Sequence, residues 1–275
     1  MLAAPRLVLR IAYLGAGFAG WQRQPGVRTV QGDLEHALAR VYRAPVALRG
    51  AGRTDAGVHA AGQAAHLDPP FAIPPRGLRA ALNRLLADDV RVVAVRLAPP
   101  GFDARRSAQA KRYRYRVAWG EPLEPWEGLR CWQLAARPDL ARVRRALAAV
   151  VGTHDFAAFA SSGHAGTGAR GTERTIFAAR LAVRGRRAAV VLDGDGFLRG
   201  MARRIAGALV EVGRGAQPVS WFVALVRCPR TAPPAPTAPA HGLTLERVVY
   251  AGRPPAGDDR RAPRSRRAGR ARSAC

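Results

Sequence analysis

The chain has 275 residues, 48% of them hydrophobic, and 45 basic residues against 19 acidic ones, a formal net charge of +26. This length allows one large core or two ordinary ones, and we expect two domains. Because binding to phosphates releases counterions, so positive a chain points to a polyanionic partner, with nucleic acid first and an anionic membrane second.

Cysteine usage and hydropathy narrow the class of protein further. Cys131, Cys228 and Cys275 are odd in number, widely spaced and without CxxC motifs, which argues against a disulfide framework or a zinc site and fits the reducing cytoplasm. No run approaches the ~18 apolar residues of a membrane span. Almost every cation is an arginine, whose planar group grips phosphate in two places, although genomic base composition also favours arginine over lysine.

The first half, residues 1–108, is predicted to be α+β. Alternating residues over 6–13 indicate a strand, and Thr29 caps a helix with Val30, Leu34 and Leu38 on one face. Short strands are expected over 46–48 and 63–67, a helix over 78–86 and a strand over 90–97.

The second half, residues 109–252, repeats the scheme. We expect strands over 113–119 and 131–134, a helix over 140–151, strands over 175–183 and 188–192, and a helix over 197–212. A proline-rich connector over 233–239 precedes a last strand over 243–250. Residues 253–275, rich in arginine and poor in large apolar residues, are predicted to be a disordered RNA-binding or solubility arm.

A glycine motif near the N-terminus suggests a dinucleotide site. Residues 15–20 (GAGFAG) match GxGxxG and follow a predicted strand. The motif must also open a helix, however, and here Pro25 and Gly26 signal a turn before the helix begins after Thr29. A nicotinamide- or flavin-dependent oxidoreductase is therefore the weaker alternative.

Residues 52–60 (GRTDAGVHA) hold the strongest candidate site. Asp55 lies between glycines that let a ligand approach the backbone, next to Arg53, whose charge keeps a carboxylate ionised. By spacing alone, an ordinary turn aspartate is the simpler interpretation.

These nine residues resemble the signature of the tRNA pseudouridine synthase A family. Other blocks resembling the family follow in its order, so that the resemblance spans residues 6–251. They are Tyr13, Gly15, Phe18 and Gly20-Trp21-Gln22; Thr29-Val30-Gln31 and Leu34-Glu35; Phe102, Ala104-Arg105 and Ser107; Arg112-Tyr113-Arg114-Tyr115; Gly152 and His154-Asp155-Phe156; Arg174-Thr175-Ile176; Gly196-Phe197-Leu198, Met201, Arg203 and Gly207; and Ala238-Pro239-Ala240 with Gly242-Leu243. Leu14, Asp103, Arg106, Ala202 and Arg204 depart from the family's usual residues, which leaves details of RNA docking open.

The resemblance implies a fold, a reaction and roles for four residues. The fold is α+β, with two similar halves whose antiparallel strands join in one extended sheet and whose helices pack on one face. The reaction is isomerisation of uridine to pseudouridine in the tRNA anticodon arm, at positions 38 to 40, by a cytoplasmic homodimer without cofactor or metal. Asp55 is the catalytic carboxylate, acting at the ribose, at the base or as a base at the sugar. Tyr113 stacks on the extruded base, Arg53 helps extrude it or holds its phosphate, and Arg203 pairs with the carboxylate.

Each assignment has a plainer alternative. Tyr113 can be a core aromatic, as we expect of Tyr115, and Arg203 a solvated helix charge. His59, His66 and His154 lack metal-ligand spacing, so we expect them to pack or to hydrogen-bond, with His154 at a helix end. A noncatalytic RNA-binding protein with tandem RRM-like halves would share the charge and the fold class.

Overall fold

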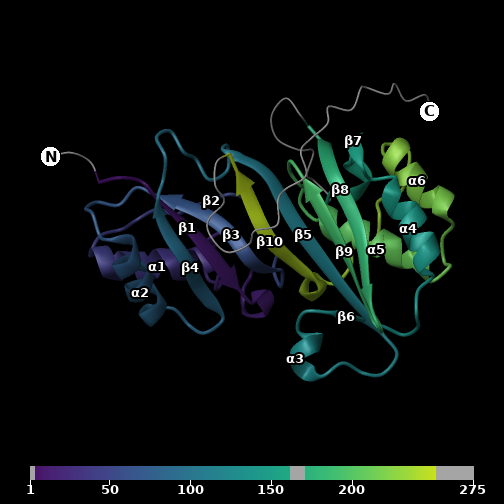
Figure 1. Cartoon of the computed structure of the whole chain (residues 1–275), viewed down its shortest axis with the longest axis horizontal. Coiled ribbons are helices and arrows are strands. Elements are labelled where there is room, and N and C mark those ends of the chain that lie inside the picture. The colour runs from purple at the N-terminus through teal and green to yellow at the C-terminus, as the bar shows by residue number, and fades with distance from the viewer. Residues whose placement is uncertain (1–3, 162–170, 252–275) are drawn as a thin grey trace. The chain divides into compact units, whose positions relative to one another are not determined.

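A computed structural model describes residues 4–161 and 171–251 (Figure 1). The chain divides into two compact units: the first runs to Lys111 and resumes at Thr244, and the second runs from Arg112 to Leu243. The last strand, which the sequence analysis placed in the second half, thus groups with the first unit, because it pairs there with a strand formed by residues 59–67. The predicted arm over 253–275 lies outside the described residues.

The first unit is built on a mixed group of strands. Their order is β4-β1-β3-β10, with β2 also beside β3. β1 is antiparallel to β3 and β4, whereas β10 is parallel to β3, so the strands are not antiparallel throughout. The elements are β1 (Leu7–Tyr13), a short 3-10 turn η1 (Gly15–Gly17), α1 (Val30–Tyr42), β2 (Arg49–Gly50), β3 (His59–Leu67), α2 (Pro75–Leu85), β4 (Val90–Leu97) and β10 (Leu243–Tyr250).

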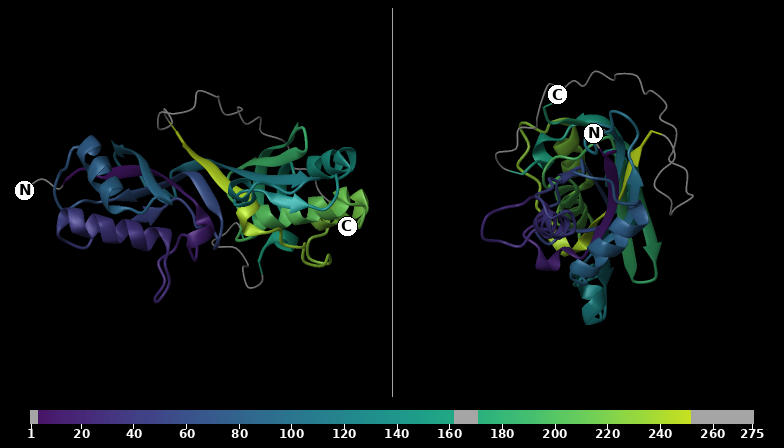
Figure 2. Two further views of the ribbon diagram at one scale, coloured as in Figure 1. Left: turned by 90° about the horizontal axis from the view of Figure 1, so that it is seen from below. Right: turned by 90° about the vertical axis from the view of Figure 1, so that its left-hand side faces the viewer.

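Alternation along β1 sets the core of the first unit. Leu7, Leu9, Ile11 and Tyr13 are buried while the residues between them are partly exposed, as expected of a strand with one covered face. Helices α1 and α2 lie on one side of these strands (Figure 2). α1 begins where predicted, because the Thr29 hydroxyl accepts a hydrogen bond from the amide of Gly32 at 3.2 Å.

The second unit has the strand order β5-β9-β8-β7, with β6 parallel to β5. β8 is antiparallel to both β7 and β9. The elements are β5 (Ala108–Trp119), which begins at the end of the first unit, α3 (Pro125–Gly128), β6 (Trp132–Leu134), α4 (Leu140–Ala148), β7 (Gly152–Asp155), the 3-10 turn η2 (Ala157–Phe159), β8 (Glu173–Arg184), β9 (Arg187–Gly194), α5 (Met201–Gly213), α6 (Val219–Arg227) and the 3-10 turn η3 (Ala240–Gly242).

Aromatic contacts fill much of the core of the second unit. Phe159 packs on both Phe156 and Phe222, with ring centroids 6.0 and 5.8 Å apart, and all three side chains are fully buried. On α5, Met201, Ile205, Leu209 and Val212 are also buried. These four positions recur at helical spacing, so α5 presents one apolar face to the core.

The predicted α+β class is confirmed, and four local predictions are wrong. Residues 46–48 form no strand, because the Leu48 amide and carbonyl bond to the side chains of Glu35 and Gln31 on α1. The helix over 140–151 ends at Ala148, and His154 lies in strand β7 instead of at a helix end. α5 begins at Met201, after Gly200 with φ of 76°, and not at residue 197. α6 was not predicted.

No helix among the described residues is long and apolar enough to span a membrane.

Candidate functional site

Asp55 lies in the loop that joins β2 to β3 in the first unit. Its side chain is partly exposed, whereas Thr54 before it is buried. The Asp55 carbonyl accepts a hydrogen bond from the Val58 amide at 3.1 Å, and Gly57 has φ of 77°, so the chain turns tightly after the carboxylate. We call residues 51–58 the aspartate loop.

The N-terminal glycine motif supports this loop. The Trp21 amide donates to the Thr54 carbonyl at 3.1 Å, and Gly20, with φ of 101°, lies so close that a Cβ atom there would be 2.8 Å from the same carbonyl oxygen. A Cβ on Gly15 would be 2.2 Å from the Val58 carbonyl oxygen. The glycines therefore allow two backbone segments to touch, and no helix follows Gly20 as a dinucleotide site requires.

A buried polar network on β1 and β3 holds the aspartate loop in place. The Tyr13 and Thr54 hydroxyls are 2.8 Å apart, and the fully buried Gln63 donates from Nε2 to the Gly52 carbonyl at 2.9 Å. Burial raises the pKa of the Tyr13 phenol, so it stays neutral and able to donate. β1 and β3 thus fix the loop through side chains whose hydrogen bonds would otherwise be missing in the core.

Positive charge lies beside the loop. Lys111 donates from Nζ to the Ala51 carbonyl at 2.9 Å, and a Cβ on Gly52 would be 2.9 Å from the same nitrogen. Arg53 is exposed. An ammonium and an exposed guanidinium on this loop attract a phosphate-bearing ligand.

Tyr13, Gln63 and Lys111 support this loop, a role that the sequence pattern did not predict for them. Gln63 carried a signal, since it is a polar residue in an otherwise apolar stretch of β3, at a position that faces the core.

The histidines of this unit bear out the structural prediction for them. His59 is buried and accepts a hydrogen bond from the Gly15 amide at Nδ1, 2.9 Å away. His66 is buried and accepts from the Ala104 amide at 3.0 Å. Among the described residues there is no group of three or more histidines, cysteines or carboxylates placed to hold a metal ion.

Tyr113 lies on β5 in the second unit, with only 8% of its surface exposed. Its ring meets Phe197 edge-on, with centroids 4.8 Å apart and planes at 70°. Tyr115 donates its hydroxyl to the Pro239 carbonyl at 2.8 Å and packs against Gly242, where a Cβ would be 2.5 Å from the ring. Tyr115 is therefore a packing residue, as predicted, and Phe197 helps to fix the orientation of the Tyr113 ring.

Arg203 lies on α5 and is half-buried. It donates from Nε to the Ala238 carbonyl at 2.9 Å, and its own carbonyl accepts from the Ala238 amide at 3.2 Å. The proline-rich connector reaches α5 at Gly207, where a Cβ would be 2.3 Å from the Pro236 carbonyl oxygen. The connector thus orients the Arg203 guanidinium, which makes this residue more constrained than a solvated helix arginine.

A buried ion pair stands next to Tyr113 in the sequence. Arg112 donates two hydrogen bonds to Asp193 on β9, at 2.6 and 2.9 Å, and Arg180 on β8 adds a third at 2.8 Å. The Asp193 side chain is only 9% exposed. This bidentate pair fixes β5 on β9 immediately before Tyr113.

The chain is similar to known proteins of one family. Residues 146–251 match the model of a family described as tRNA pseudouridine synthase. Proteins named tRNA pseudouridine synthase A are similar over nearly the whole chain. That of Frankia casuarinae is 46% identical over 254 residues, 89% of each chain. That of Geobacter sulfurreducens is 42% identical over 88% of this chain and 98% of its own, and that of Myxococcus xanthus is 41% identical over 92% and 94%. The chain belongs to the tRNA pseudouridine synthase A family.

Proposed function

We propose that the chain isomerises uridine to pseudouridine in the anticodon arm of tRNA, at positions 38 to 40, with Asp55 as the catalytic carboxylate. Family membership supports the reaction and the substrate class. In this reaction the bond from N1 of uracil to the ribose breaks, the base turns, and C5 bonds to the same ribose carbon. C5 then loses its proton and N1 gains one, so the atoms balance without redox chemistry or net hydrolysis.

The assignment of Asp55 rests on the hydrogen bonds that hold its loop in place. The aspartate loop is fixed by Trp21, Tyr13 and Gln63, while Asp55 itself stays partly exposed in a loop that Lys111 also contacts at Ala51. A catalytic group needs a fixed position and access to its substrate at the same time. An ordinary turn aspartate does not require a buried three-residue network beneath it.

The remaining roles follow from the family resemblance and from chemistry. Tyr113 stacks on the extruded uracil, replacing stacking worth roughly 1–3 kcal/mol per base. Arg53, exposed next to the catalytic loop, helps extrude the base or holds its phosphate. Arg203, oriented by the Ala238 carbonyl, supports the charge of the carboxylate. We further propose that the enzyme works as a cytoplasmic homodimer.

Tritium release tests the site assignment. With tRNA carrying tritium at C5 of uridine, the wild type should release the label into water as pseudouridine forms. Asp55→Asn and Asp55→Ala should release none, while Asp88→Asn, a fully exposed aspartate of the same unit, should match the wild type. Retained activity in either Asp55 variant would overturn the assignment, and a wild type that binds tRNA without releasing tritium would point to a noncatalytic RNA-binding protein.

Arg203→Ala gives a second test. If this arginine supports the carboxylate, the rate constant kcat should fall strongly while tRNA affinity changes little. Turnover at the wild-type rate would contradict the role.

A further inference from the structure

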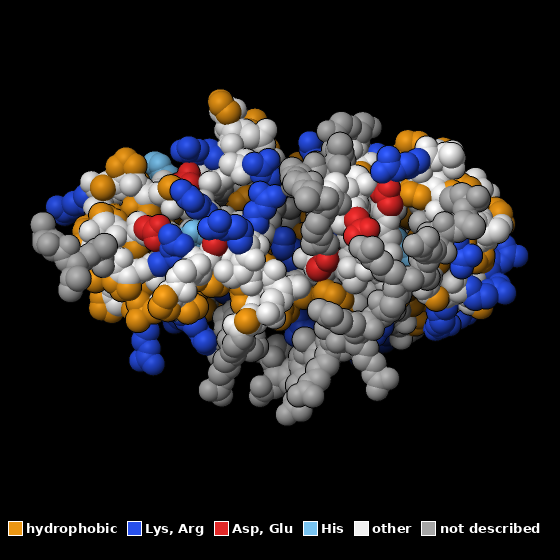
Figure 3. Space-filling view, turned by 90° about the horizontal axis from the view of Figure 1, so that it is seen from above, with side chains coloured by type: hydrophobic (Ala, Val, Ile, Leu, Met, Phe, Trp, Pro, Cys, Tyr) orange, Lys and Arg blue, Asp and Glu red, His pale blue; other side chains and the backbone are white. Residues whose placement is uncertain are grey.

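The turn between β4 and β5 carries two adjacent exposed arginines, Arg105 and Arg106. The Arg106 side chain is 86% exposed. They belong to the first unit, where basic side chains gather on the face shown in Figure 3. We call residues 102–107 the arginine turn.

The arginine turn is closed by its own hydrogen bonds. The Asp103 carboxylate accepts from the amides of Arg105 at 2.9 Å and Arg106 at 2.8 Å. The Ser107 hydroxyl accepts from the Asp103 amide at 3.0 Å, and the Ser107 amide donates to the Asp103 carbonyl at 2.9 Å. Four bonds within five residues leave the backbone little freedom.

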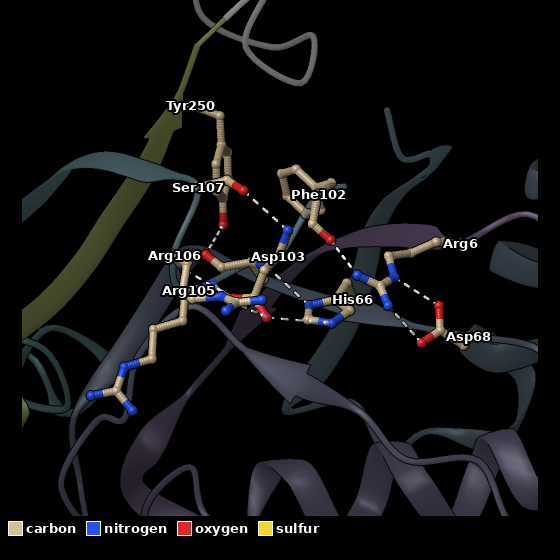
Figure 4. Close-up of polar contacts among 10 residues, drawn as sticks. Arg6, His66, Asp68, Phe102, Asp103, Arg105, Arg106, Ser107 and Tyr250 are labelled. Carbon is tan, nitrogen blue, oxygen red and sulfur yellow. Dashed lines mark hydrogen bonds and ion pairs between the residues drawn. The ribbon is translucent and has the colours of Figure 1, made fainter. Parts of the chain in front are cut away.

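The turn is also anchored to the strands below it (Figure 4). The Ala104 amide donates to His66 on β3, and the Ala104 carbonyl accepts from the Tyr250 hydroxyl on β10 at 2.7 Å. Arg6 donates to the Phe102 carbonyl, and the Phe102 ring packs on Tyr250 with centroids 4.9 Å apart. The turn is therefore held at Phe102 and Ala104, immediately before the two arginines.

Nearby carboxylates are already engaged. Asp68 receives two hydrogen bonds from Arg6, at 2.7 and 2.8 Å. Asp103 is held by backbone amides, and Nε of Arg106 lies 4.0 Å from its carboxylate oxygen, too far for a hydrogen bond. These amide bonds, the largest cause of the shift, keep the pKa of Asp103 below its usual value. The Arg105 guanidinium makes no hydrogen bond or ion pair with the described residues. The carboxylate of the turn is thus occupied by amides of the turn itself, while the two arginine side chains are exposed to solvent.

We propose that the arginine turn is a preorganised clamp for the phosphate backbone of RNA, separate from the catalytic loop. A guanidinium offers a rigid fork of donors that matches phosphate oxygens, and two of them on a fixed turn lose little entropy when they bind. The clamp reads phosphate and not base identity, so it positions RNA without specifying sequence. It rests on tRNA as the substrate class and not on the role of Asp55.

Binding of unmodified tRNA as a function of salt tests the clamp. In Arg105→Gln/Arg106→Gln, the logarithm of affinity against the logarithm of salt concentration should lose about 1.5 units of slope, roughly the release expected for two phosphates. Arg76→Gln/Arg84→Gln removes the same charge from exposed positions on α2 of the same unit and should change the slope much less. Equal slopes for the two double variants would overturn the proposal.

Variants at Asp103 distinguish a rigid clamp from a simple effect of positive charge. Asp103→Ala makes the chain more positive, so simple electrostatics predicts equal or tighter binding. The clamp predicts binding weaker by about threefold or more, because the turn loses the acceptor for two amides. Asp103→Asn keeps an acceptor oxygen and should restore affinity. Wild-type affinity in Asp103→Ala, with its fold checked by circular dichroism, would refute the requirement for a rigid turn. All measurements are of binding, so a failure of the catalytic assignment leaves them interpretable.

Discussion

Removal of one buried hydroxyl should separate positioning of the aspartate loop from folding. Tyr13→Phe deletes the oxygen 2.8 Å from the Thr54 hydroxyl and keeps the ring that contacts Phe18 and Trp21. The buried Thr54 hydroxyl then lacks this partner, which costs about 1–3 kcal/mol. At roughly 2–4 °C per kcal/mol for a chain of this size, Tm should fall by about 2–12 °C.

The larger effect should be on the rate. Thr54 adjoins Asp55, and displacement of a catalytic group by about 1 Å costs on the order of 100-fold. We therefore expect kcat for tritium release to fall by about 10- to 100-fold at a temperature where the variant is fully folded, with KM changed much less. The matched control is Tyr42→Phe, since the buried Tyr42 hydroxyl makes no hydrogen bond with the described residues. Equal turnover in the Tyr13 and Tyr42 variants would refute this explanation.

Three further perturbations test the structure around the site. Gly20→Ala should abolish most tritium release and lower Tm, because its Cβ would be 2.8 Å from a carbonyl oxygen. Gly26→Ala also strains a backbone at positive φ but has nothing within 4 Å, so it should lower Tm by less and leave tritium release at the wild-type rate. Burial lowers the pKa of His66, so stability should fall as pH drops below about 6.5, where the unfolded chain takes up the proton first; thermal melts of His66→Gln should lose part of this pH dependence, and an unchanged profile would contradict it. Asp193→Asn should lower the free energy of unfolding in urea by about 3–5 kcal/mol, because it leaves the Arg112 guanidinium poorly paired in a buried position, and a loss below about 1 kcal/mol would argue against that pair.

Local patterns predicted several elements closely. β4 and β10 have the predicted bounds, and β1 and α1 begin within one residue of them. β1 and α1 each bury one apolar side, which is the signal that a periodic pattern carries. α6 escaped prediction since a short apolar run after Pro218, without a capping side chain, fits a strand as well as a helix. β7 has no fully buried residue and carries no alternating apolar signal.

Long-range pairing was beyond local patterns. Nothing near Thr244 indicates that it lies beside His59 in a parallel pair. The same holds for the candidate site. The motif resemblance predicts roles for Asp55, Tyr113, Arg53 and Arg203. Tyr13 and Lys111, in contrast, are seen to support the loop only once the strands are paired.

The return of β10 to the first unit has a consequence for biosynthesis. β3 has one edge on β1, while its other edge is shared between β2, at His66, and β10, at His59 and Ala60. Until the ribosome has made residues 243–250, part of that edge beside the aspartate loop has no partner, and uncovered strand edges promote misassociation. The nascent N-terminal portion should therefore mature late, and a chain terminated before residue 243 should aggregate instead of yielding an independent half-enzyme.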